Sequence, residues 1–91
     1  MDETVRDNPA LSRYEMDVAD GVAFANYRAE GDTVLVTHTE VPSSLRGRGL
    51  GDRLVKGMLE QARASGRKVV PLCSFVSHYM RRHPEYRDLM G

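Results

Sequence analysis

The sequence predicts an α/β domain built on a mixed sheet, with its elements in the order β-β-β-α-β-α. The first observation is that the stretch before residue 42 contains three extended segments separated by turn signals. The second is a stripe of apolar residues at helical spacing over Leu50–Ala64. The third is a short apolar run after that helix, over Lys68–Cys73. We therefore expect three antiparallel strands and a fourth strand parallel to the third, with the helices packed on the sheet.

The first three strands are expected to form an antiparallel meander. In Arg13–Val18, apolar and charged side chains alternate, which is typical of a half-buried strand. Asp20-Gly21 and Glu30-Gly31-Asp32 are tight-turn signals. The strands that these turns delimit are Arg13–Val18, Val22–Ala29 and Thr33–Val41.

The second half of the chain alternates between helix and strand. Gly66 is a natural left-handed cap for the first helix, and Ser74 is a candidate N-cap for the second. The apolar run between these helices predicts a strand buried on both faces. In order, the expected elements are the helix Leu50–Ala64, the strand Lys68–Cys73, a helix from Phe75 to about Arg82, and one more turn over Pro84–Leu89.

Length and composition indicate one small domain. We assign residues 11–91 to this domain and residues 1–10 to a flexible leader. The single cysteine suits a reducing compartment. The N-terminus has no apolar signal-peptide region, and no apolar run approaches the roughly 20 residues of a membrane span. We expect a cytoplasmic protein without a membrane partner.

Charge is unevenly distributed along the chain. Residues 1–41 contain nine acidic and three basic residues, a net charge of −6, whereas residues 42–91 contain ten basic and four acidic residues, a net charge of +6. This asymmetry indicates that the second half faces an anionic ligand, although a solvated basic helix surface is the alternative. A nucleic-acid partner is not expected, because exposed aromatic residues are not interleaved with the basic ones.

The turn Arg46–Gly51 is the strongest candidate for that anion site. It lies between a predicted strand and a helix, where unpaired N–H groups and the helix dipole attract anions. Its glycines allow a phosphate to approach closely, and Arg46 and Arg48 add positive charge. The spacing matches neither the dinucleotide fingerprint nor the P-loop. The alternative is a tight turn that binds no ligand.

In this setting, Arg46-x-x-Gly49-x-Gly51 resembles the acyl-CoA-binding motif of the GNAT acetyltransferase superfamily. The resemblance implies a minimal GNAT fold, without the helices that larger members carry between their first two strands and without their last two strands. A closer resemblance, to the minimal single-domain N-acetyltransferase family, rests on four stretches: His38-Thr-Glu-Val-Pro42, Leu45-Arg-Gly-Arg-Gly-Leu-Gly51, Pro71-Leu-Cys-Ser-Phe-Val76 and Arg81-Arg-His-Pro-Glu-Tyr86.

The resemblance implies that acetyl-CoA is the cosubstrate. Its pyrophosphate would bind the backbone N–H groups of the turn, with Arg46 and Arg48 adding charge-assisted bonds. Its pantetheine arm would run between the third and fourth strands and pair with backbone near Thr39 and Val41. The expected acetyl-CoA-binding residues are Thr39, Val41, Arg46, Gly47, Arg48, Gly49, Leu50 and Gly51.

His38 and Glu40 are candidate catalytic residues. They lie two positions apart on a strand, so their side chains share a face about 7 Å apart. An imidazole is a natural base for an ammonium near neutral pH, and Glu40 is a base acting through water or a site for the substrate cation. The alternative is that both are ordinary polar residues at an exposed end of the sheet.

Cys73 and Tyr79 are the other catalytic candidates. Cys73 ends a strand before a helix N-terminus, which lowers a thiol pKa. It is either a nucleophile activated by His38, or a residue that lines the thioester site, or a buried structural cysteine. The resemblance implies that Tyr79 protonates the departing thiolate, although Tyr79 also falls on an apolar stripe with core character. His78 and His83 lack metal-ligand spacing, so we expect no metal.

The function predicted from these features is acetyl transfer to an amine by direct attack in a ternary complex, or through an acetyl-Cys73 intermediate. The acceptor is a small-molecule or protein amine. One alternative is a coenzyme A-binding module without efficient turnover, and another is a small protein-interaction domain. A monomer is expected, or a weak homodimer paired through an exposed strand edge at Arg13–Val18.

Overall fold

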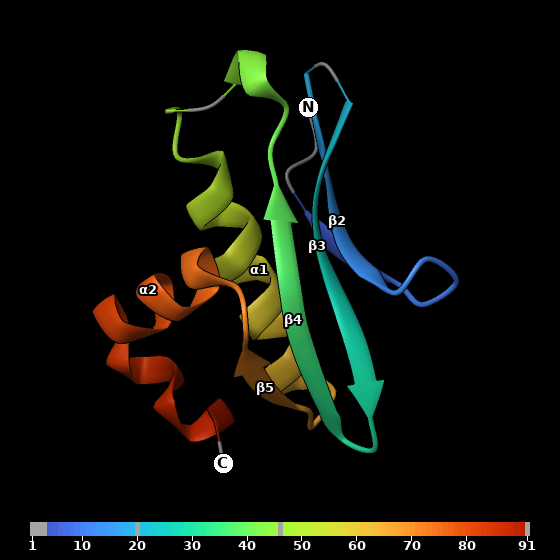
Figure 1. Cartoon of the computed structure of the whole chain (residues 1–91), viewed down its shortest axis with the longest axis vertical. Coiled ribbons are helices and arrows are strands. Elements are labelled where there is room, and N and C mark those ends of the chain that lie inside the picture. The colour runs from blue at the N-terminus through green and yellow to red at the C-terminus, as the bar shows by residue number, and fades with distance from the viewer. Residues whose placement is uncertain (1–3, 20, 46, 91) are drawn as a thin grey trace.

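The computed structural model describes residues 4–19, 21–45 and 47–90 as a five-stranded sheet with helices gathered on one side (Figure 1). The strand order is β1-β2-β3-β4-β5, antiparallel from β1 to β4 and parallel between β4 and β5. This arrangement confirms the predicted α/β class. It also confirms that the strand after the first helix runs parallel to the strand before that helix. The strands are β1 Val5–Asn8, β2 Arg13–Val18, β3 Gly21–Glu30, β4 Thr33–Glu40 and β5 Lys68–Pro71. The helices are α1 Leu50–Ala64 and α2 Ser74–Arg82, with short 3-10 segments η1 Ser43–Leu45 and η2 Pro84–Met90.

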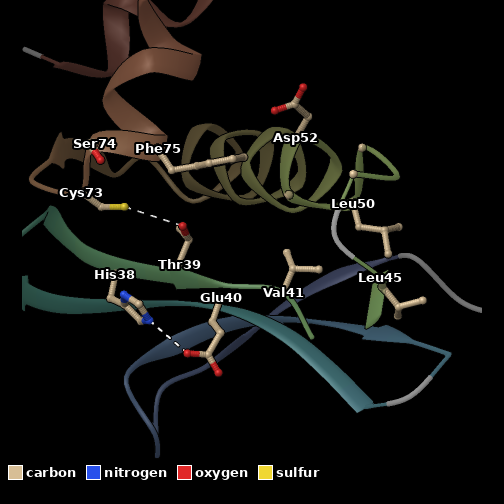
Figure 2. A pocket seen from close by; sticks show the side chains of 13 residues that line it. His38, Thr39, Glu40, Val41, Leu45, Leu50, Asp52, Cys73, Ser74 and Phe75 are labelled. Carbon is tan, nitrogen blue, oxygen red and sulfur yellow. Dashed lines mark hydrogen bonds and ion pairs between the residues drawn. The ribbon is translucent and has the colours of Figure 1, made fainter. Parts of the chain in front are cut away.

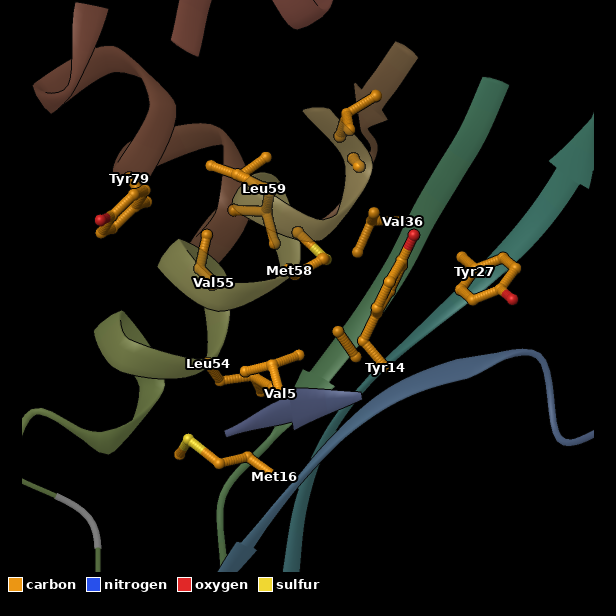
Figure 3. Packing of buried hydrophobic residues seen from close by; sticks show 14 of the residues in the cluster. Val5, Tyr14, Met16, Tyr27, Val36, Leu54, Val55, Met58, Leu59 and Tyr79 are labelled. Atoms are coloured by element: carbon orange, nitrogen blue, oxygen red, sulfur yellow. The ribbon is translucent and has the colours of Figure 1, made fainter. Parts of the chain in front are cut away.

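A single hydrophobic core lies between the sheet and the helices (Figure 3). The alternation seen in the sequence decides which side chains enter it, because successive residues of a strand point to opposite faces. The apolar stripe of α1 covers the strand residues that face it. The fully buried members with the largest side chains include Tyr14, Met16, Val34 and Val36 from the sheet, and Leu54, Val55, Met58 and Leu59 from α1.

The expected flexible leader is wrong for residues 5–8, which form the strand β1 along β2. Val5 is buried and rests against the middle of α1, where Gly57 lacks a side chain: a Cβ there would lie 2.3 Å from Val5 Cγ2. Gln61 of α1 donates a hydrogen bond of 2.8 Å to the carbonyl oxygen of Val5. One buried apolar residue gives no periodic signal, so the strand was missed.

A polar network fixes the other end of β1. Asp7 accepts hydrogen bonds from the hydroxyl of Tyr27 at 2.6 Å and from Arg67 at 3.1 Å, and Arg67 also donates to the hydroxyl of Tyr14 at 3.2 Å. Burial and then the nearby Asp7 carboxylate raise the pKa of Tyr27 to about 12. With β1 in place, β2 is paired on both sides, so Arg13–Val18 is not the exposed edge that the homodimer hypothesis required.

A β-bulge divides β4 into two parts. Tyr27 pairs with Val36 and Asn26 pairs with His38, so Thr37 is an extra residue on β4. Such an insertion shifts the alternation of side chains by one residue. Before the bulge Val36 faces the helices, whereas after it Thr39, opposite buried Ala25, faces them.

The strand β5 pairs with only the first half of β4, from Thr33 to Val36. The N–H groups of Leu72 and Cys73 both donate to the carbonyl oxygen of Val36, and the chain then turns away into α2. The expected strand therefore ends two residues early. Burial on both faces is also wrong, because Val69 is buried but Val70 is 36% exposed. The described helices cover one face of the sheet and leave the other, which we call the open face.

The helix boundaries agree with the sequence except at one cap. The helix α1 begins at Leu50 and ends at Ala64, as predicted, and Gly66 has a left-handed φ of 73°. The N-cap of α2 is Cys73, so Ser74 is the first residue of that helix and not its cap. The last turn, predicted over Pro84–Leu89, is present as η2.

Candidate active site

A cleft of about 600 Å³ opens where β4 and β5 separate (Figure 2). One wall comes from the end of β4, the second from the glycine turn and the first turn of α1, and the third from the start of α2. The lining residues are His38, Thr39, Glu40, Val41, Leu45, Gly47, Gly49, Leu50, Gly51, Asp52, Cys73, Ser74 and Phe75. Segments that are far apart in the sequence thus line one cleft.

The glycine turn forms the end of the cleft next to α1. Gly47 and Gly49 have left-handed φ angles of 83° and 74°, and Gly49 is the N-cap of α1 without a side-chain capping bond. The N–H groups of the first turn are therefore open to a ligand. Arg48 is exposed but does not line the cleft, and Arg46 lies outside the described residues.

Phe75 forms the roof of this end and was not predicted as a site residue. Its ring lies directly over Gly51, where an added Cβ would be 2.7 Å from the ring carbon Cζ. The side chain is 41% exposed. A third glycine in the turn was the available signal, since it allows the aromatic ring to approach the helix backbone.

Cys73 lies on the opposite wall and faces Thr39 (Figure 2). Its Sγ atom is 3.6 Å from Thr39 Oγ1. Partial burial acts to raise the pKa of the thiol, but the N–H of Val76, the hydroxyl of Thr39 and the N–H of Phe75 outweigh it, and the pKa lies below its ordinary value. These groups lower the pKa because their hydrogen bonds stabilise the thiolate more than the thiol.

His38 and Glu40 share a face, as expected, but it is the open face. Nε2 of His38 lies 3.2 Å from Oε1 of Glu40, and both side chains are more than half exposed. The His38 ring makes an edge contact with the ring of Phe24. The guanidinium of Arg13 lies over the same Phe24 ring. Figure 2 shows both side chains on the side of β4 that faces away from Cys73. The structure therefore brings His38 to Glu40 and not to Cys73.

Tyr79 lies apart from the cleft. Its side chain is buried beneath α2, and its ring stacks on that of His83 with centroids 4.1 Å apart. Burial, followed by the negative charge of Asp52, raises the pKa of its hydroxyl. Of the two readings of Tyr79, the packing role is the one that the geometry supports.

Thr39 was expected to contribute only its backbone, and the structure gives its side chain a place as well. The extra residue at Thr37 turns Thr39 towards Cys73, and no local pattern in Thr33–Val41 marks that insertion.

No group of three His, Cys, Asp or Glu side chains in the described ranges is arranged to hold a metal ion. None of the described helices is both long and apolar enough to cross a membrane.

Comparisons with known proteins bear on the family and on the fold. A family model described as GCN5-related N-acetyl-transferase matches residues 13–89. The NMR solution structure of a GCN5-like protein from Staphylococcus aureus superposes with a TM-score of 0.71, at 24% sequence identity, over 97% of this chain and 87% of that chain. At this identity the structural likeness shows the shared fold alone.

Proposed function

Because the chain belongs to the GCN5-related N-acetyltransferase family, as its motifs predicted, we propose that it transfers an acetyl group from acetyl-CoA to an amine. The observation that carries this proposal is the cleft between the separated strands, which joins the glycine turn of α1 to the thiol at the start of α2. One end suits a pyrophosphate and the other suits a thioester.

The pyrophosphate end is formed by backbone. Gly47, Gly49 and Gly51 line it, and the first-turn N–H groups from Leu50 onward supply hydrogen bonds and the positive end of the helix dipole. Arg48, which is exposed in the same turn, adds positive charge near them. This arrangement requires no side-chain cap, and none is present at Gly49.

The pantetheine arm fits along the second half of β4. Because β5 pairs only as far as Val36, the backbone of Thr39 and Val41 has no strand beside it on the side of the cleft. An extended chain of amides binds such an edge as an added strand does. This path leads from the glycine turn towards Cys73.

In direct transfer, the amine nitrogen attacks the thioester carbonyl carbon. The new C–N bond forms, the C–S bond breaks, and the sulfur of coenzyme A takes the proton that the attacking nitrogen loses. His38 accepts the ammonium proton before the attack, and Glu40 stabilises the imidazolium that results. Since both side chains lie on the open face, the acceptor approaches from that face while acetyl-CoA occupies the helix side.

The covalent route uses Cys73 as nucleophile. The Cys73 thiol loses its proton and the thiolate attacks the thioester carbonyl; the C–S bond breaks and coenzyme A takes that proton and leaves as the thiol. The amine nitrogen then attacks the acetyl-cysteine, and the proton that the nitrogen loses restores the Cys73 thiol. The lowered pKa of Cys73 supports this route, whereas the orientation of His38 away from Cys73 supports direct attack. We favour direct attack, in which Cys73 and Thr39 line the thioester site.

A coenzyme A-binding module without turnover is the second candidate. The observation that favours it is that Tyr79, the expected proton donor, is packed outside the cleft. The two candidates differ in whether free coenzyme A thiol is released when acetyl-CoA and a panel of primary amines are supplied. Release that falls on replacement of His38 supports the enzyme, and binding without release supports the module.

The decisive test is calorimetric titration with acetyl-CoA on the wild type, Gly49→Glu and Gly66→Glu. Both glycines have left-handed φ angles, 74° and 73°, and open space around an added Cβ. The two variants therefore carry the same backbone strain, but only Gly49→Glu places a carboxylate in the cleft. We expect affinity to fall at least about 100-fold in Gly49→Glu and to persist in Gly66→Glu.

Failure of the folded wild type to bind acetyl-CoA would overturn the proposal and its second candidate together. It would leave the small protein-interaction domain as the remaining hypothesis. Equal loss of binding in both variants would indicate a general effect of strain and would contradict the assignment of the glycine turn.

A further inference from the structure

A row of contacts crosses the open face from β2 to the proposed base His38. Glu15 of β2 lies opposite Phe24 of β3 in the sheet, and the Phe24 ring meets the His38 ring with centroids 6.4 Å apart and planes at 61°. The guanidinium of Arg13 lies over the Phe24 ring, 4.5 Å from its centre. Through one aromatic ring, His38 is thus connected to β2, none of whose residues, Arg13–Val18, lines the cleft.

Glu15 is buried although it lies on the open face. It stands between two core residues of β2, so its side chain points away from the core, yet it is only 4% exposed. It is the one buried charged residue in the part of the chain that the structure describes. Its carboxylate pairs with Arg6 at 3.0 Å and with Arg13 at 2.5 Å, and it accepts a hydrogen bond of 3.2 Å from the side-chain amide of Asn8.

The buried carboxylate restrains Arg13. The hydrogen bond from Arg13 is the main cause that holds the pKa of Glu15 below its ordinary value. A buried carboxylate must keep such partners, because the loss of one leaves part of its charge uncompensated. The Arg13 guanidinium is therefore fixed at one edge by Glu15 and rests with its face on the Phe24 ring.

A second pair with the same spacing shows what is unusual about the first. Arg28 and Glu30 also lie two residues apart on the open face and form an ion pair of 3.1 Å through the same Nε atom. Their side chains are 64% and 60% exposed, whereas those of Arg13 and Glu15 are 26% and 6% exposed. An exposed pair of this kind contributes little and leaves its arginine mobile. Of the two arginines, Arg13 is the one that is held firmly enough to fix an aromatic ring.

The Phe24 ring in turn restricts His38. The His38 side chain is 56% exposed, and among the described residues its polar partner is Glu40. A half-exposed side chain with one such partner exchanges between rotamers. Phe24 lies opposite Glu40 in the sheet, so its ring occupies the space into which the imidazole would otherwise turn towards β2. This matters for the reaction, because a misplacement of about 1 Å in a catalytic group costs up to about 100-fold in rate.

We propose that Phe24 is a positioning residue for His38, and that the buried pair of Arg13 and Glu15 holds the Phe24 ring in place. This inference rests on the proposed function, in which His38 accepts the ammonium proton of the acceptor. Phe24 and Arg13 act on the rate through the geometry of the base, without contact with acetyl-CoA or the reacting atoms. Its consequence is that acetyl transfer depends on β2, a strand outside the cleft.

The first test is a mutant cycle on kcat for acetyl transfer, measured as release of free coenzyme A thiol. Phe24→Leu keeps an apolar side chain but removes the flat ring. We expect kcat to fall about tenfold and KM for acetyl-CoA to stay within about twofold. In the His38→Ala background the same substitution should have no further effect, because a positioning residue acts through the group that it positions. A tenfold loss in that background as well would overturn the inference, since Phe24 would then act on the acceptor itself.

The role of the buried pair is tested by Arg13→Lys, with Arg28→Lys as the matched control. Lysine leaves Glu15 a positively charged partner, so the sheet should stay folded, but it has no flat group to lie over the Phe24 ring. We expect kcat to fall about threefold in Arg13→Lys, to fall no further when Arg13→Lys is added to Phe24→Leu, and to stay unchanged in Arg28→Lys. Equal losses in Arg13→Lys and Arg28→Lys would contradict the role of the buried pair.

A second readout does not depend on catalysis. The imidazole C–H signals of His38 in NMR spectra are identified by their absence from His38→Ala, and the neighbouring aromatic ring shifts them. Phe24→Leu should move these signals and Arg28→Lys should leave them in place. Signals that do not respond to Phe24→Leu would overturn the inference.

The remaining outcomes separate this inference from the function beneath it. A wild type that releases thiol at a rate which Phe24→Leu does not change would overturn the positioning role alone and leave the proposed function intact. A wild type that binds acetyl-CoA but releases no thiol with any amine of the panel would overturn the proposed function, and the positioning role with it.

Discussion

The two halves of β4 differ although they belong to one strand. Residues 33–36 pair with β3 on one side and β5 on the other, and Val34 and Val36 are buried in the core. Residues 38–40 pair with β3 but not with β5, and these residues, His38, Thr39 and Glu40, line the cleft. The bulge at Thr37 separates the half that stabilises the fold from the half that holds the candidate chemistry.

The difference shows how a domain of this size combines a core and a site in one element. The half that is paired on both sides fixes the position of the strand, so the half that is paired only with β3 is held in place beside the cleft. Substitutions on the two sides of the bulge should therefore affect different measurements.

The largest effect is expected at Val36, which is fully buried. Val36→Asp places a carboxylate in the core without a partner, and we expect unfolding free energy to fall by about 4 kcal/mol or more. Thr37→Asp, one residue away and exposed at the bulge, should change it by less than about 0.5 kcal/mol. Urea unfolding followed by circular dichroism measures both. Comparable losses in the two variants would contradict the division of β4 at the bulge.

A smaller effect, on rate and not on stability, is expected at the open face. His38→Ala should lower kcat for acetyl transfer about 100-fold, because it removes the base, and Glu40→Gln should lower it about tenfold. Asp17→Asn is the control: Asp17 also lies on the open face but is paired with Arg6. Release of free thiol from acetyl-CoA measures all three. A His38→Ala variant with wild-type kcat would remove His38 from the mechanism.

The smallest effect is expected at Thr39. Its hydroxyl helps to hold the pKa of Cys73 below the ordinary value, so Thr39→Val should raise that pKa and reduce the thiolate fraction near neutral pH. The measurement is the rate of alkylation by iodoacetamide as a function of pH. We expect the midpoint to move to higher pH, with unfolding free energy changed by about 1 kcal/mol or less. An unchanged midpoint would show that the helix N–H groups alone stabilise the thiolate.

Much of the fold could be predicted from periodicity and turn residues. The bounds of β2 and α1 agree with the sequence to the residue, because an alternating strand and an amphipathic helix each carry their own pattern. β1 could not be found in this way, because its only buried residue, Val5, depends on a space left by Gly57 more than fifty positions later. Contacts between distant residues leave no local period.

The candidate site was predicted in its parts but not in its orientation. The glycine turn and Cys73 were found because glycine spacing and the end of a strand are visible in the sequence. The side of the sheet that His38 faces was not predictable, because a bulge of one residue reverses it and arises only from pairing with β3. Phe75 was not predicted as a site residue for a similar reason, because the position of its ring depends on the approach of α2 to Gly51.

The contact between Val5 and Gly57 also limits how far the chain can be shortened from its N-terminus. The family match begins at residue 13, and an expression clone trimmed to that boundary would lack β1. The notch in α1 at Gly57 would then face water, and β2 would become a bare edge open to association with other chains. A purification tag joined close to residue 5 would disturb the packing of Val5 against Gly57. Vectors for this protein should keep the first eight residues and carry any tag at the other end.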